Sequence, residues 1–218
     1  MTRLEYYFGT VGQLSAGFFI RDFTNFFQSV TLASTPEFLA IYGLDEQTYG
    51  AYPVTTQVNN PVNVRMTGLE VGYRQALTFL PHWARGIQVV ANVTSQRAKN
   101  TNNLTDMSPF SGNWGLSVTR PKWNLRINEN HRGRQRLLPV TGSGIGPGTY
   151  DYMTKRRYID VSGEYFLRRS LGLFVSARNI NGAAEDQMIY GPLTPSYARF
   201  RAREAYRPMW TVGIKGTL

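Results

Sequence analysis

Apolar and polar residues alternate with a period of two over most of the chain. In residues 170–181, for example, Leu171, Leu173 and Val175 fall on one parity, whereas Ser176 and Arg178 fall on the other. Successive side chains of a β-strand point to opposite faces of its sheet, so such segments predict strands with one apolar and one polar face. The pattern predicts nine strands, at residues 3–9, 13–29, 62–78, 86–97, 111–120, 122–134, 156–167, 170–181 and 207–218.

Charged residues in the centres of these strands lie on the polar parity. A charge on the lipid-facing side of a membrane barrel costs about 2–4 kcal/mol at the bilayer midplane, so this segregation is what a barrel requires. We expect the carboxylates of Asp160 and Glu164 to pair with arginines of this face rather than to form an acid/base pair. The charges predicted to face the barrel interior are Arg21, Glu70, Arg74, Arg126, Asp160, Glu164, Arg178 and Lys215.

The predicted strands are joined by alternating short and long connections. The short ones lie near residues 10–12, 80–85, 121 and 168–169, and the long ones at 30–61, 98–110, 135–155 and 182–206. Outer-membrane barrels show this alternation, with short periplasmic turns and long extracellular loops. Aromatic residues near strand ends are consistent with a membrane-interface girdle. One short helix is expected in the first long connection, with Thr35 as its N-cap and Pro36 as its first residue.

The composition limits the chemistry that the chain can perform. Its 218 residues contain no cysteine, which excludes disulfides and cysteine-ligated metals, and its two histidines, His82 and His131, are far apart in sequence. The glycine-rich run at residues 142–148 does not have the spacing of a nucleotide-binding loop. We therefore expect no enzymatic activity, no metal site and no cofactor.

Basic residues give the chain a net charge of +10, and many of them lie in the long connections. Arginine pairs well with carboxylates and phosphates, and tyrosine can stack on a ligand, so these connections are candidate ligand-binding regions. Contact with lipopolysaccharide phosphates or simple solvation would equally account for the arginines. The candidate ligand-binding residues are Tyr42, Tyr49, Arg132, Arg134, Tyr152, Arg157, Tyr190 and Arg201.

The order of several segments resembles the C-terminal half of a TonB-dependent outer-membrane receptor. These segments are residues 4–8, 14–17, 66–73, 158–181 and 210–218. The resemblance implies an all-β fold in which residues 1–218 are one partial barrel domain, supplying about nine C-terminal strands of a 22-stranded barrel in a bacterial outer membrane. An odd number of strands does not close such a barrel, and the chain begins within a strand, so N-terminal strands are expected to be missing. Leu218 departs from the family's usual terminal aromatic residue.

The same resemblance implies a set of partners. They are outer-membrane lipid and lipopolysaccharide, a plug domain and N-terminal strands that this chain lacks, the TonB complex acting through that plug, and a small-molecule or oligosaccharide ligand such as a ferric siderophore or a glycan; nucleic acid is not expected. Two alternatives stay open. One is a passive outer-membrane porin, and the other is a soluble all-β module that binds an anionic polymer.

Overall fold

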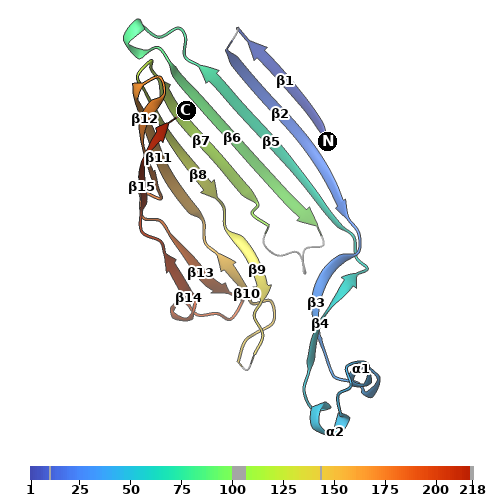
Figure 1. Cartoon of the computed structure of the whole chain (residues 1–218). Helices are drawn as coiled ribbons and strands as arrows, with labels where there is room; N and C mark the ends of the chain where they lie inside the picture. Colours follow the sequence, from blue (N-terminus) through green and yellow to red (C-terminus); the bar gives the residue numbers. More distant parts are fainter. Residues whose placement is uncertain (10, 100–106, 143, 217–218) are drawn as a thin grey trace. The chain divides into compact units, whose positions relative to one another are not determined.

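The computed structural model describes residues 1–9, 11–99, 107–142 and 144–216. Its main element is a nine-stranded antiparallel sheet in which each strand pairs with the sheet strands next to it in the chain (Figure 1). The strands, in order across the sheet, are β1 (Thr2–Phe8), β2 (Gly12–Phe23), β5 (Val64–Ala76), β6 (Ile87–Lys99), β7 (Phe110–Thr119), β8 (Trp123–Arg132), β11 (Arg156–Arg168), β12 (Leu171–Arg178) and β15 (Met209–Gly216).

Each of these nine strands lies where the alternation predicts one, and their register explains why the two parities separate. Directly paired residues point to the same face of a sheet, so each row across the strands belongs to one face. One row, from β6 to β15, is apolar throughout: Val89, Leu116, Ile127, Val161, Ala177 and Trp210. The neighbouring row on the opposite face is polar throughout: Gln88, Ser117, Arg126, Ser162, Ser176 and Thr211.

The long connections contain secondary structure that the alternation did not predict. A four-stranded antiparallel sheet has the order β14-β13-β10-β9, and a two-stranded sheet joins β3 to β4. Their bounds are β3 (Phe26–Leu32), β4 (Val54–Asn60), β9 (Gln135–Pro139), β10 (Tyr150–Met153), β13 (Ala184–Tyr190) and β14 (Phe200–Ala205). The long connections at 30–61, 135–155 and 182–206 lie where they were expected, but the alternation missed the short strands within them, which are held by pairing between distant segments.

The second predicted strand, at residues 13–29, is also shorter than expected. β2 ends at Phe23 and β3 begins at Phe26. Between them Asn25 has a φ of 52°, a left-handed conformation that interrupts an extended strand and that asparagine tolerates better than most residues.

Two short helices lie between β3 and β4. The predicted helix is α1 (Pro36–Ile41), and Thr35 caps it by accepting a hydrogen bond from the Phe38 amide at 3.2 Å. A second helix, α2 (Glu46–Tyr49), is capped by Asp45, whose Oδ2 accepts from the amide of Thr48 at 2.9 Å. Residues 21–66, with residues 98–99, belong to one compact unit, and most of the nine-stranded sheet belongs to another. No helix in the described residues is long and apolar enough to cross a membrane.

Few apolar side chains are buried in the described part of the chain. They are Phe19, Leu39, Val64, Met66, Ala84 and Ala177. By contrast, the apolar parity of the nine-stranded sheet is largely open, and Trp210, Val212 and Ile214 on β15 are 66%, 77% and 72% exposed. Among the described residues of the unit that contains most of the sheet, no second layer covers this face as the partner sheet of a sandwich would.

Candidate functional site

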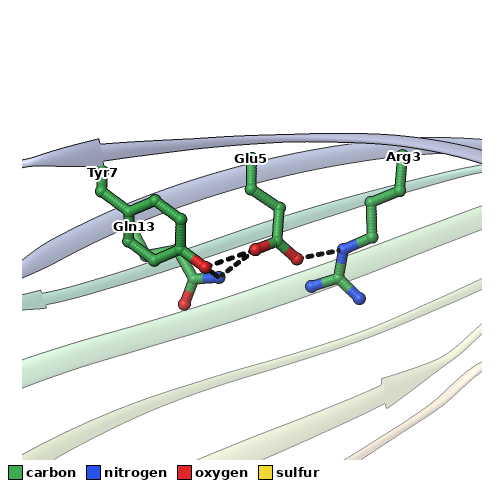
Figure 2. A network of polar contacts seen from close by, with 4 residues as sticks. All are labelled: Arg3, Glu5, Tyr7 and Gln13. Carbon is green, nitrogen blue, oxygen red and sulfur yellow. Dashed lines mark hydrogen bonds and ion pairs between the residues drawn. The ribbon is translucent and has the colours of Figure 1, made fainter.

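On the polar face of the nine-stranded sheet, some charges pair with neighbours on the same face. On β1, Arg3 Nε lies 2.8 Å from Glu5 Oε1, and the Tyr7 hydroxyl donates to the other carboxylate oxygen of Glu5 (Figure 2). Gln13 on β2, paired with Tyr7 in the register, donates to Glu5 at 3.4 Å. Figure 2 shows the side chains of β1 in this network extending to one side of the strand.

The two carboxylates of β11 have partners other than those expected. Glu164 lies 3.4 Å from the ammonium of Lys215 and accepts a hydrogen bond from Asn124 at 3.2 Å. Asp160 accepts from the backbone amide of Asn179 at 2.9 Å. Arginines were the expected partners of both carboxylates, whereas these contacts come from a lysine, an asparagine amide and a backbone amide. Asp160 instead holds the chain where it leaves β12.

The four-stranded sheet brings three of the candidate ligand-binding residues together. The guanidinium carbon of Arg134, just before β9, lies 4.7 Å from the ring centroid of Tyr152 and 5.2 Å from that of Tyr190. The two rings themselves meet edge to face, with 5.4 Å between centroids. Arg199 approaches the Tyr190 ring to 5.5 Å, a contact that the sequence did not suggest. Cation–π contacts of this kind hold guanidinium groups in place without neutralising them.

Arg201, another candidate, is neutralised by an acidic partner. Its guanidinium pairs with Asp151, which is buried. On the neighbouring strands Arg203 forms two hydrogen bonds with Asp186, at 2.6 and 2.8 Å, and these bonds hold the pKa of that carboxyl below its usual range. The sequence did not single out Asp151 and Asp186, because each acidic residue meets its arginine only through the pairing of distant segments.

The remaining candidates do not join this cluster. Arg157 pairs with Glu129 at 3.4 Å on the apolar parity of the sheet. Tyr42 follows α1, with its ring 5.1 Å from that of Phe38, and Tyr49 is the last residue of α2; both belong to the unit of residues 21–66. Of the eight candidates, the structure therefore brings Arg134, Tyr152 and Tyr190 together.

Arg132 lines a hollow of about 360 Å³ on the polar face, near the end of the sheet that carries the long connections. Arg156 and Tyr158 at the start of β11 also line it, and both contact Glu185 on β13; the Tyr158 hydroxyl donates to Glu185 Oε1 at 2.5 Å. The lining residues are Asn92, Thr94, Ser111, Gly112, Asn113, Asn130, His131, Arg132, Arg156 and Tyr158.

The asparagines of this hollow were not identified from the sequence. Each belongs to a different strand and is one polar residue among many on its parity, so only the register shows that they are neighbours. In the described part of the chain, no group of three or more His, Asp or Glu side chains is arranged to hold a metal ion.

Comparisons with known proteins give a structural match. No protein-family model matches the chain, and no curated protein matches it in sequence. A solved structure, that of the copper transporter OprC, is similar with a TM-score of 0.63 and 16% sequence identity. The match covers 99% of this chain and 30% of that chain, so this chain spans about a third of the length of OprC. At this identity the likeness shows the fold alone: an antiparallel sheet of the kind present in that transporter.

Proposed function

We propose that the chain forms part of the barrel wall of an outer-membrane receptor for energised nutrient uptake. The observation that carries this proposal is the apolar face of the nine-stranded sheet, whose strand centres are apolar and whose large side chains are exposed within their own compact unit. Its opposite face carries the amides, hydroxyls and charges. Lipid outside and a polar interior are the environments that these two faces fit.

Water is a poor environment for the apolar face. Large contiguous apolar patches on soluble monomers are rare and favour association or aggregation. A soluble sandwich would bury this face against a second sheet, and the four-stranded sheet is too small and too rich in arginine for that role. Closure with further strands would pair the edge strands β1 and β15, as the hydrocarbon region requires.

The residues at the two ends of the sheet differ, and the difference indicates which end would face the periplasm. At the short-turn end the apolar parity carries Phe8, Tyr73, Trp123 and Tyr165, and the turn before β6 exposes 80% of Trp83. Aromatic side chains of this kind favour the membrane–water interface. At the other end the apolar parity changes to charge, with Glu129 on β8 paired to Arg157 on β11 at 3.4 Å. We therefore place the short turns in the periplasm and the long connections outside the cell.

The receptor class rests on the resemblance of the sequence segments to TonB-dependent receptors. In that class a 22-stranded barrel surrounds a plug, and this chain would supply about nine C-terminal strands. The likeness to a transporter three times as long supports a partial barrel of this kind. The long connections would capture a scarce nutrient, and a plug outside residues 1–218 would contact the TonB complex.

The experiment is to express residues 1–218, alone and within any longer product of the same gene, and to fractionate the cells. We expect a detergent-soluble outer-membrane species whose electrophoretic migration changes on boiling, as folded barrels show. A folded species that remains in the soluble fraction without detergent would contradict the proposal. In liposomes a plugged receptor would not admit small sugars, whereas a passive porin would cause swelling.

A further inference from the structure

We propose that the hollow on the polar face of β6, β7, β8 and β11 binds a polyhydroxylated anion, such as an acidic oligosaccharide. The inference rests on the proposed function, which makes this face the inner wall of the barrel, and it specifies the class of ligand. Three observations support it. The register of four strands places the lining side chains together, three asparagine amides have no hydrogen-bond partner among the described residues, and the charged groups that line the hollow are arginines.

The register arranges the lining side chains in two adjacent rows. Each row takes one residue from each of β6, β7, β8 and β11, all on the polar parity. The first row consists of Asn92, Asn113, Asn130 and Tyr158. The second row, one step nearer the long connections, consists of Thr94, Ser111, Arg132 and Arg156. Three amides, two hydroxyls, a phenol and two guanidiniums thus surround a space of about 360 Å³, which is within the range of small-molecule sites.

The amides of Asn92, Asn113 and Asn130 are available to a ligand. All three residues are exposed, and no hydrogen bond joins their side chains to another group in the described part of the chain. An asparagine amide offers two N–H donors and one carbonyl acceptor. A sugar hydroxyl both donates and accepts, so a row of amides matches a row of hydroxyls better than it matches an apolar or purely cationic ligand.

The charges around the hollow favour an anion. Arg156 is paired with Glu185, whereas Arg132 is exposed and has no acidic partner among the described residues. No Asp or Glu is among the described residues that line the space. One guanidinium is therefore uncompensated, and its planar donors suit a carboxylate, sulfate or phosphate group. A neutral sugar would use the amides but leave this charge without a partner.

The test compares two probes that share a sugar backbone and differ in whether their carboxyl groups are ionised or esterified. Tetragalacturonate carries carboxylates, whereas its fully methyl-esterified form keeps the hydroxyls and lacks the charges. Binding to the full-length protein, purified in detergent from outer membranes, is measured by titration calorimetry. We expect saturable binding of tetragalacturonate and at least about tenfold weaker binding of the ester, the effect of losing one charge-assisted hydrogen bond.

Single substitutions separate the contribution of the Arg132 charge from that of the asparagine hydrogen bonds. Arg132→Gln should weaken tetragalacturonate binding about tenfold and leave the ester unaffected, whereas Asn130→Ala should weaken both probes severalfold. Asn128→Ala is the matched control, because Asn128 lies on the same strand and face but outside the hollow, and it should change neither affinity.

Three results would overturn the inference: no binding of tetragalacturonate, equal binding of both probes, or equal effects of Asn128→Ala and Asn130→Ala. Heat-dependent migration is recorded on the same samples. A protein that migrates as a folded barrel but fails to bind disproves this inference alone, whereas a sample without that migration disproves the proposed function.

Discussion

Glu129 on β8 and Arg157 on β11 form an ion pair on the face of the sheet whose centre is apolar, with 3.4 Å between Oε1 and Nε. Toward the short turns, the same parity continues with Ile127 and Ile159. A charged pair on this face fits water or lipid headgroups rather than hydrocarbon, where a charge costs about 2–4 kcal/mol. This pair therefore marks the end of the apolar band on these two strands, and charge nearer the short turns should be poorly tolerated on this face.

A charge placed inside the apolar band should prevent membrane insertion. Val175 on β12 lies in this band, and its neighbours across the strands are Gly163 and Val212. We expect Val175→Arg to destabilise the inserted protein by about 2–4 kcal/mol, since the guanidinium would face hydrocarbon. The heat-modifiable fraction in outer membranes measures the effect.

The adjacent residue provides the control for this substitution. Ser176 points to the polar face, where its neighbours are Ser162 and Thr211. Ser176→Arg should leave insertion nearly unchanged. Equal losses from the two substitutions would show that the faces do not differ in environment.

Asn179 should stabilise the start of the connection between β12 and β15. It is buried at a φ of 52°, donates to the carbonyls of Ala183 and Tyr206 at 3.0 and 2.9 Å, and accepts from the Ala183 amide at 2.8 Å. We expect Asn179→Ala to lower the free energy of unfolding by about 2–4 kcal/mol, because several backbone groups lose their partners. Urea unfolding in detergent measures this.

Glycine at the same position separates the effect of backbone conformation from the effect of the side-chain hydrogen bonds. Asn179→Gly keeps the left-handed conformation accessible but removes the same hydrogen bonds. If Asn179→Gly were as stable as the wild type, backbone conformation rather than hydrogen bonding would account for the role of Asn179.

The contact between β13 and β14 should weaken at low pH. Hydrogen bonds from Arg203 lower the pKa of Asp186, so their stabilisation is present above the carboxyl's ordinary pKa of about 4 and is lost as the pH falls through the lowered value. Amide exchange in β13 and β14, corrected for intrinsic rates, should therefore accelerate in acid. Asp186→Asn should exchange faster at neutral pH and show less dependence on pH; an unchanged pH dependence would rule out Asp186 as its source.

The Tyr190 ring should restrain Arg134 and Arg199. A cation–π contact contributes at least about 0.5–1 kcal/mol, so Tyr190→Leu should make tryptic cleavage after these arginines faster by about two- to fivefold or more. Tyr190→Phe keeps the aromatic face and should behave as the wild type does. Faster cleavage of the phenylalanine variant would indicate that the hydroxyl, rather than the ring face, matters.

The sequence predicted the nine-stranded sheet because parity is a local property of each strand. Leu171, Leu173 and Val175 identify a face without any knowledge of their partners. The small sheets of the long connections were missed because strands such as β10, four residues long, are too short for an alternation to be recognised.

For the candidate site, too, the sequence showed the types of residue but not the contacts between distant segments. Arg134, Tyr152 and Tyr190 were chosen as candidates because arginine can pair with an anion and tyrosine can stack on a ligand. The structure places these three residues together. It also shows that Arg201 is neutralised by Asp151, which residue type could not reveal. The row of Asn92, Asn113 and Asn130 depends on the register of three strands, and no single segment contains that information.

The most direct test of the account is to locate lipid against one face of β12. The chain contains no cysteine, so a single cysteine at Val175 or at Ser176 can carry a bimane fluorophore in an otherwise unmodified protein. The labelled proteins are reconstituted in bilayers with brominated acyl chains. The account predicts strong quenching from Val175→Cys and little from Ser176→Cys. Equal quenching at both positions, or none at Val175→Cys, would contradict the assignment of the apolar face to lipid.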